Sequence, residues 1–197
     1  MSSIEGKIEK SIKSKQRGVL LFADDFIGYG SSDAIRQALV RLVKKEVIRR
    51  VAQGIYVRPI ISEHIGEVLP TAEEVAQGIA KRDKIKIVPT GTHALNKLGL
   101  STQVPLKLVY LTDGAPREIQ IGKRTIRLKK TTPKNLLAKG KISSLVIQAL
   151  REVGQNGVTP ALESKIIDLL KKEETKALEH DIPLAPVWIR KIMQKAL

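Results

Sequence analysis

The sequence predicts a mixed α+β protein of 197 residues, in which helices and short strands form separate blocks. Three observations support this class. Apolar residues recur at helical spacing near both ends of the chain, β-branched residues form short runs between turn residues, and glycine or proline separates the blocks. We therefore expect three regions: residues 1–62 and 63–140, which combine helices with strands, and residues 141–197, which are helical.

The first region is expected to open with a helix over residues 4–16, where isoleucine stands at positions 4, 8 and 12 and forms one buried stripe. A short strand at residues 19–22 and a short helix at residues 23–27 follow. The turn Gly28-Tyr29-Gly30 separates them from the next helix. The aromatic side chains of this segment are expected to pack in a small core.

A second helix is predicted to begin at Ser31 and Ser32, because a serine hydroxyl can accept a hydrogen bond from a free backbone N–H of the first helical turn. One face of this helix is apolar and carries Ile35, Ala38, Leu39 and Leu42. The opposite face carries Asp33, Arg36, Gln37, Val40, Arg41 and Lys44. Arginine and glutamine are the side chains that bind guanine and adenine edges through two hydrogen bonds.

Beyond Lys45 the apolar period changes from about four to about two, which is typical of strands. Residues 47–51 and 55–58 are rich in β-branched side chains, and Gly54 can supply the positive φ that a tight hairpin requires. Pro59 ends the second strand because proline cannot donate a hydrogen bond to a sheet. We expect a hairpin directly after the basic helix.

A capped basic helix followed by a hairpin is the pattern of a winged helix-turn-helix, which places one helix in the DNA major groove with the hairpin, or wing, beside it. From Arg36 to Arg58 there are seven Lys or Arg residues and one acid, Glu46. A basic face that is merely solvated is the alternative explanation. The residues expected to contact double-stranded DNA are Ser31, Ser32, Arg36, Gln37, Arg41, Lys44, Arg49, Arg50, Gln53 and Arg58.

The chain carries a net charge of +15, which favours a polyanionic partner. Aromatic residues make up only 3%, so stacking platforms for single strands are scarce and duplex DNA is the better candidate. The absence of cysteine excludes disulfides, thiolate metal sites and thiol catalysis, and it suits a cytoplasmic protein. No apolar run reaches the roughly 18 residues of a membrane-spanning helix and no signal peptide is recognisable, so we expect no membrane partner.

The second region is expected to begin with a helix from Thr71 to about Lys81, because Thr71 and Glu74 have the spacing of a capping box. The elements that follow should form a small α+β unit with helices beside a largely antiparallel sheet. Strands are predicted at residues 85–88 and 107–112, a helix at 93–98, and a hairpin from 118–121 and 125–129.

The third region is predicted to be helical. Residues 142–153 have apolar side chains at helical spacing, and a further helix is expected to start at Pro160, because proline suits the first position of a helix. A last helix is expected after Pro186 and contains the sole tryptophan, Trp188.

A second basic segment includes the predicted hairpin and the residues after it, where no acidic residue occurs between Glu118 and Glu152. It can be a second nucleic-acid surface, a docking face for an acidic protein, or a solvated edge strand protected by lysine. The sequence leaves these three alternatives open. The residues of this candidate surface are Lys123, Arg124, Arg127, Lys129 and Lys130.

Catalytic, metal and cofactor sites are not expected. The histidines at positions 64, 93 and 180 lack the paired spacing of metal ligands, and the common phosphate-loop, zinc and nucleophile motifs do not occur. Asp24 and Asp25 resemble a carboxylate pair, but adjacent helical positions diverge by about 100°. They are better explained as first-turn acids favoured by the helix dipole. The sequence thus predicts a binding protein and not an enzyme.

Two longer segments carry a resemblance to a known family. They read IRQALVRLVKKEVIRRVAQGIYVRP and PTGTHALNKLGLSTQVPLKLVYLTDG. Over roughly residues 4–135 the chain resembles the AbiEi-type antitoxins of bacterial abortive-infection (type IV) toxin–antitoxin systems, which take part in phage defence. The resemblance implies that the winged helix represses the protein's own promoter. It also implies that the remaining domain antagonises a toxin with a nucleotidyltransferase fold, by direct contact or indirectly, and that the chain is not an enzyme.

By residue match, the resemblance assigns Ser32, Arg36, Gln37 and Arg41 to the recognition helix and Arg49, Arg50, Gln53 and Arg58 to the wing. Two alternatives remain. One is a stand-alone winged-helix regulator with a partner- or ligand-sensing domain, and the other is a basic RNA-binding protein. The oligomeric state is open, because two monomers can occupy a near-palindromic site and the helical region can also mediate self-association.

Overall fold

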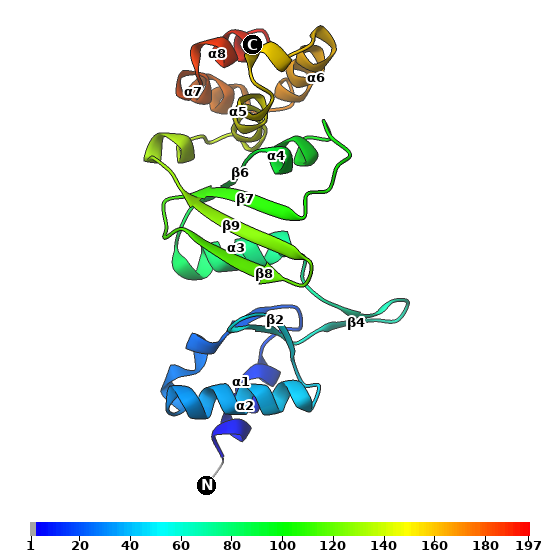
Figure 1. Ribbon diagram of the computed structural model, residues 1–197, viewed down its shortest axis with the longest axis vertical. Coiled ribbons are helices and arrows are strands. Elements are labelled where there is room, and N and C mark those ends of the chain that lie inside the picture. The colour runs from blue at the N-terminus through cyan, green and yellow to red at the C-terminus, as the bar shows by residue number, and fades with distance from the viewer. Residues whose placement is uncertain (1–2) are drawn as a thin grey trace. The chain divides into compact units, whose positions relative to one another are not determined.

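The computed structural model describes residues 3–197 and confirms the mixed α+β class (Figure 1). Contacts within the chain divide it into two compact units. The N-terminal unit comprises the residues up to Ile79 together with 119–124, and the C-terminal unit comprises residues 80–118 and 125–197. Helix α3, Ala72–Asp83, spans this boundary.

The N-terminal unit is built from two α-helices, a 3-10 helix and five short strands. In chain order these are α1 (Ile4–Ser14), β1 (Leu20–Phe22), η1 (Ala23–Tyr29), α2 (Ser32–Lys44), β2 (Arg49–Ala52), β3 (Ile55–Val57), β4 (Ile60–Ser62) and β5 (Gly66–Val68). The predicted helices, the first strand and the hairpin are confirmed to within a few residues.

The predicted turn at residues 28–30 was wrong in part, because the 3-10 helix η1 continues through Tyr29. In a 3-10 helix, side chains three positions apart eclipse each other. Phe26 and Tyr29 therefore lie on the same side of η1, with their ring centroids 6.0 Å apart. Packing of these two rings against the core explains why the helix does not end at Gly28.

The core of the N-terminal unit joins the helices to the sheet. Ile8 and Ile12 of α1 and Leu39 and Leu42 of α2 are fully buried, as their helical spacing predicts. A Cβ atom at Gly30 would lie only 2.7 Å from Cδ1 of Ile4, so glycine lets α1 approach the start of α2 closely.

A three-stranded antiparallel sheet, with strand order β1-β3-β2, completes this unit. The β2–β3 hairpin turns at Gln53 and Gly54, and Gly54 has the expected positive φ of 70°. The register shifts between Arg50 and Ala52, which makes a bulge that increases the local twist of β2. The strand expected at residues 19–22 pairs with this hairpin, as predicted.

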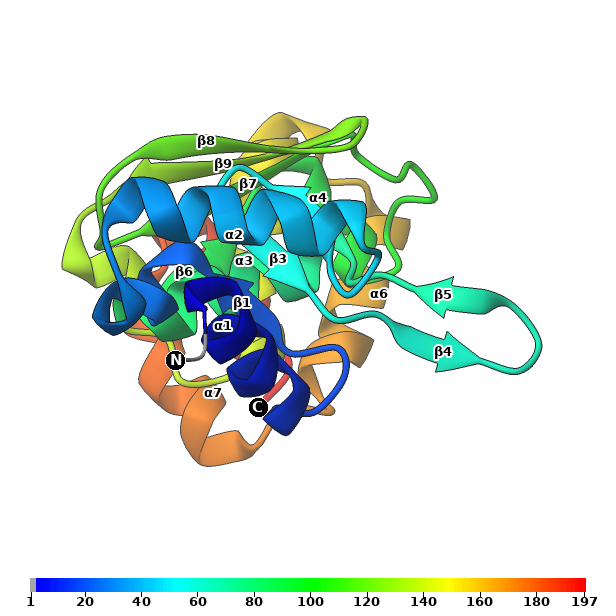
Figure 2. The same cartoon turned by 90° about the horizontal axis from the view of Figure 1, so that it is seen from below.

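The hairpin β4–β5 was not predicted. Its strands pair only with each other, and it extends away from the helices and sheet of the N-terminal unit (Figure 2). Ile61 and Ile65 are 56% and 75% exposed. A two-stranded hairpin has little stability of its own in water. Its base is held by two hydrogen bonds, from Gly18 N–H to the Arg58 carbonyl and from Arg17 to the Pro59 carbonyl.

The C-terminal unit contains most of a four-stranded sheet and a group of helices. Its strands are β6 (Ile87–Pro89), β7 (Lys107–Thr112), β8 (Arg117–Ile121) and β9 (Arg124–Lys130), in the order β6-β7-β9-β8. The pair β6–β7 is antiparallel, but β7 and β9 run parallel. This central parallel pair was not predicted; it arises because β9 returns between β7 and β8.

The helices of this unit are α4 (Thr92–Lys97), η2 (Pro133–Leu136), α5 (Lys141–Val153), η3 (Gln155–Gly157), α6 (Pro160–Leu170), α7 (Thr175–Asp181), η4 (Ile182–Leu184) and α8 (Val187–Gln194). Helices α4, α5, α6, α7, η4 and α8 share one apolar core. Ala94 and Leu98, from α4 and its C-cap, pack in the same cluster as Leu150 and Ile189. The helices after residue 141 therefore pack together with α4, which belongs to the second predicted region, residues 63–140. Within residues 3–197, no helix is both long enough and apolar enough to cross a membrane.

Candidate nucleic-acid interface

Helix α2 begins with the predicted cap. The Oγ atom of Ser31 accepts a hydrogen bond from the backbone N–H of Ala34 at 3.3 Å, while Ser31 itself keeps extended backbone angles. This satisfies one of the free N–H groups of the first turn. Ser31 therefore serves α2 as a cap, and the neighbouring Ser32 is exposed at the first helical position.

The apolar stripe of α2 is buried, which fixes the direction of the opposite face. Arg36, Gln37, Val40 and Lys44 are exposed on that face. Arg36 donates from Nη2 to Oδ1 of Asp33 at 3.0 Å, but both side chains are more than 70% exposed. Such exposed pairs contribute little and are readily exchanged for another anion.

Arg41 lies on the flank of α2 that faces α1, where it is already paired. Its Nε atom is 2.6 Å from Oε2 of Glu5, and Nζ of Lys45 is 2.6 Å from the other oxygen. The hydrogen bond from Lys45, followed by that from Arg41, lowers the pKa of the Glu5 carboxyl below its usual value. Arg41 thus links α1 to α2, while half of its side chain remains exposed.

Two arginines of the predicted wing are also engaged within the protein. Arg49 makes a bidentate pair with Glu67, with Nε–Oε2 and Nη2–Oε1 distances of 2.8 and 2.9 Å. Arg58 is half-buried and donates from Nη1 to the backbone carbonyl of Lys13, at the end of α1, at 3.0 Å. Both side chains hold elements of the N-terminal unit together.

Four of the predicted residues border one groove: Ser32, Arg36, Arg50 and Gln53. Gln37 and Lys44 are exposed on α2 but do not line it. This groove has a volume of about 450 Å³ and lies between α2, η1 and the turn of the β2–β3 hairpin. Arg50 and Gln53 from the hairpin are exposed, as is Arg36 across from them on α2. The fold therefore brings together side chains that are up to 21 positions apart, from Ser32 to Gln53.

The groove also has an apolar component that sequence reasoning did not single out. Val40 of α2 is 46% exposed and Ile27 of η1 is 68% exposed, and both line the groove. The available signal was an apolar residue in the middle of the polar face of a helix. The sequence did not show that Ile27 of η1 would line the same groove as Val40.

The second basic segment follows the strand alternation expected for β9. Ile126 and Leu128 are buried, whereas Arg127 and Lys129 point to the exposed face. Glu118 partly neutralises this face, because its Oε1 atom lies 3.4 Å from Arg127 Nε and 3.1 Å from Lys107 Nζ. All five predicted residues of this segment are exposed. Lys123 and Arg124 belong to the N-terminal unit, and Arg127, Lys129 and Lys130 belong to the C-terminal unit.

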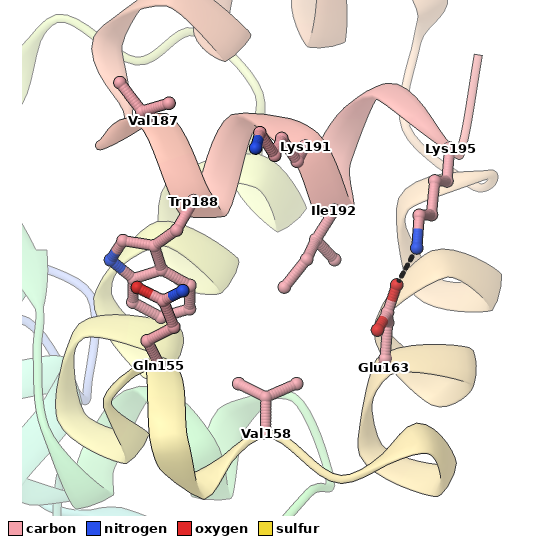
Figure 3. A pocket seen from close by; sticks show the side chains of 8 residues that line it. All are labelled: Gln155, Val158, Glu163, Val187, Trp188, Lys191, Ile192 and Lys195. Atoms are coloured by element: carbon pink, nitrogen blue, oxygen red, sulfur yellow. Dashed lines mark hydrogen bonds and ion pairs between the residues drawn. The ribbon is translucent and has the colours of Figure 1, made fainter.

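A second groove, of about 500 Å³, lies among the C-terminal helices (Figure 3). Val158 and Ile192 form its apolar middle, and Gln155 lies beside the indole ring of Trp188. On the other side, Nζ of Lys195 is 2.5 Å from Oε1 of Glu163. Sequence reasoning named Trp188 only as the sole tryptophan and did not predict this groove.

A cluster of polar groups at the start of α5 resembles a hydrolytic triad in composition but not in geometry. Ser143 donates its hydroxyl hydrogen to Asp181, and Nδ1 of His180 lies 2.7 Å from the other Asp181 oxygen. The carboxylate stands between the two, so His180 is not placed to take a proton from Ser143.

Asp181 instead serves as a structural acceptor. It is fully buried and accepts hydrogen bonds from the backbone N–H groups of Lys139 and Gly140. Burial raises the pKa of Asp181, but the hydrogen bonds from His180, Ser143 and these two N–H groups outweigh burial and hold the pKa below its usual value. The ionised carboxylate thus fixes the segment that leads into α5.

Asp25 of η1 is also structural. Asp25 accepts the backbone N–H of Phe22 at 2.9 Å, which agrees with the predicted first-turn position. Among residues 3–197, no group of three or more His, Asp or Glu side chains is arranged to hold a metal ion.

Fold and site together define a mixed α+β protein in which an exposed basic helix face and a hairpin turn border one groove. The chain belongs to DUF6088, a family of unknown function, whose model matches residues 7–178. The match spans residues from both compact units. A comparison with curated proteins gave no match.

Proposed function

We propose that the protein binds double-stranded DNA sequence-specifically, represses its own promoter and acts as the antitoxin of a nucleotidyltransferase-like toxin. One observation carries the DNA-binding part: Ser32 and Arg36 of the exposed face of α2 and the hairpin residues Arg50 and Gln53 border the same groove. This arrangement supports the proposal that α2 is a recognition helix and that the β2–β3 hairpin is its wing.

The element order supports this assignment. The short helix η1 precedes α2, as in a helix-turn-helix, and the hairpin β2–β3 follows α2 and pairs with β1. In this proposal α2 enters the major groove and the hairpin turn reaches the neighbouring phosphates. Contacts to phosphate position such a protein, and contacts to base edges supply its specificity.

Interactions with other elements of the N-terminal unit divide the predicted contact residues into two groups. The first group has exposed side chains: Arg36, Gln37 and Lys44 on α2, with Arg50 and Gln53 on the hairpin. Of these, Arg36, Arg50 and Gln53 line the groove. Arg41, Arg49 and Arg58 hold the scaffold. We therefore propose that the first group binds DNA and that the second shapes the surface.

A titration of DNA binding against salt tests the proposal. The probes are the DNA upstream of the protein's own reading frame, a random duplex of equal length and a structured RNA. We expect preferential binding to the upstream duplex and a steep loss of affinity with salt, because several cations contact phosphates. Equal affinity for all three probes would mean that the charge of +15 acts as bulk electrostatics, and the repressor proposal would fail.

The antitoxin part of the proposal rests on the family resemblance described above. A neighbouring reading frame for a nucleotidyltransferase-like protein provides the test. Co-expression of the present chain should restore growth of cells that express this toxin. A binding experiment with the two purified proteins then separates direct neutralisation from opposition to the toxin's effect.

The groove around Trp188 favours a second candidate function, a DNA-binding regulator that senses a small ligand or partner. Because Trp188 is the sole tryptophan, its fluorescence reports directly on this groove. A metabolite mixture that changes the fluorescence of Trp188 and also changes DNA affinity would support the sensing function. Rescue of toxin-expressing cells without any such ligand would support the antitoxin instead.

A further inference from the structure

We propose that Val40 reads the 5-methyl group of a thymine in the major groove, beside a guanine that is bound by Arg36. This inference rests on the proposed DNA-binding function and specifies what the site recognises. It starts from the apolar part of the groove, which the charge of the chain does not explain.

Val40 is 46% exposed in the middle of a face that is otherwise polar. Arg36 lies one helical turn before it and Lys44 one turn after it, and both are exposed. Valine has one strongly preferred χ1 rotamer in a helix, so its two methyl groups are held in a defined position. The side chain presents a small, rigid apolar surface outward.

Ile27 extends this surface. It is 68% exposed at η1 and lines the same groove as Val40. Single exposed apolar residues are common on protein surfaces and need no function. Two of them from different helices line one groove, together with the cationic side chains Arg36 and Arg50 and the acidic side chain of Asp24. A polyanion with an apolar group at a fixed position matches this combination.

In the major groove of DNA, the thymine C5-methyl is the apolar group that each A·T pair presents, and guanine presents the two acceptors that arginine binds bidentately. Residues four positions apart in a helix are separated by about 6 Å along its axis. Base pairs are stacked about 3.4 Å apart. Arg36 and Val40 therefore reach bases that are about one to two base pairs apart.

The test uses a duplex selected by the wild-type protein from a random library. Each thymine of this duplex is replaced in turn by deoxyuridine, which removes only the methyl group. We expect one replacement to weaken binding of the wild-type protein about fourfold, the value that corresponds to one buried methyl group. The Val40→Ala variant should bind the thymine and deoxyuridine duplexes equally at that position.

Guanine reading is tested in the same duplex. Replacing a guanine within two base pairs of the sensitive thymine by 7-deazaguanine removes one acceptor of the arginine contact. This change should weaken the wild-type protein and leave the affinity of the Arg36→Ala variant unchanged. Val104→Ala serves as the matched control, because Val104 is 60% exposed outside the groove, and this variant should keep the thymine preference.

The outcomes separate the two proposals. Failure to select any duplex would overturn both the DNA-binding function and the thymine contact. Selection of a duplex in which no thymine is sensitive to methyl removal would overturn the thymine contact alone. The same conclusion follows if the sensitive thymine remains sensitive with Val40→Ala, provided that the variant melts at the wild-type temperature.

Discussion

Arg49 of β2 and Glu67 of β5 form a bidentate ion pair, with distances of 2.8 and 2.9 Å, that ties the hairpin β4–β5 to the three-stranded sheet. Planar pairing of this kind satisfies two guanidinium N–H groups at once. The pair also removes one cation from the surface that is proposed to face DNA. It thus links the position of an exposed hairpin to the charge of the site.

Glu67→Gln should strengthen binding to duplex DNA of any sequence, because it leaves Arg49 with only its longer, 3.5 Å ion pair to the exposed Glu46, which a phosphate can replace. One additional phosphate contact raises the slope of log affinity against log salt by about one. Fluorescence anisotropy at several salt concentrations measures both quantities. Glu179→Gln, with the same change in charge at an exposed residue of the C-terminal unit, is the control. An equal gain with both variants would show that net charge alone is responsible.

Arg41→Ala and Lys44→Ala should differ, although both remove one cation from α2. Arg41 is paired with Glu5, so its loss should lower the free energy of unfolding slightly, with little effect on DNA affinity. Lys44 is exposed on the outward face, and its loss should weaken DNA binding and lower the salt slope by about one. Thermal melts and salt titrations distinguish them, and a reversed pattern would contradict the assignment of the two flanks.

Arg36→Ala and Arg50→Ala should separate base reading from phosphate contact. Loss of a bidentate base contact costs about 1–3 kcal/mol on the preferred duplex and relaxes specificity at one position. Loss of a phosphate contact weakens all sequences about equally. Competition between preferred and random duplex measures the difference. Equal losses on both duplexes with Arg36→Ala would exclude its role in base reading.

Acid should destabilise the wild-type protein in part through Asp181. Because the pKa of this carboxyl is lowered in the folded state, its stabilising contribution is present above the pKa of the unfolded chain and is lost as the pH falls through the folded value. Stability should therefore decrease below about pH 4, near the usual value of an aspartate. Asp181→Asn should be less stable at pH 7, by about 1–3 kcal/mol, and show a weaker acid dependence. Urea unfolding from pH 3 to 7 measures both effects, and parallel curves for the two proteins would contradict them.

Local rules accounted for much of the N-terminal unit. Ser31 caps α2, Gly54 turns the hairpin and the stripe from Ile35 to Leu42 is buried, as expected. The reciprocal hydrogen bonds between Thr71 and Glu74 likewise form at the start of α3. These features depend on residues within a few positions of each other, so that spacing and side-chain chemistry suffice to predict them.

Interactions between residues far apart in the sequence could not be predicted from these local rules. Of the ten predicted contact residues, Arg41, Arg49 and Arg58 are bound within the protein. Their partners are Glu5, Glu67 and the Lys13 carbonyl, which lie 18 to 45 positions away in the sequence. The parallel pairing of β7 with β9 depends on where the chain returns after β8. Neither relation leaves a signal in the local pattern.

The sequence by itself determined the class of fold, the polar face of α2 and the positive charge of the chain, because these follow from periodicity, capping and composition. Only the tertiary structure decided that Arg36, Arg50 and Gln53 meet in one groove with Val40 and Ile27, and that Arg41, Arg49 and Arg58 do not face it. The physical reason is that an ion pair or a groove depends on distances between side chains, and those distances are set by the packing of α1, η1 and the sheet around α2.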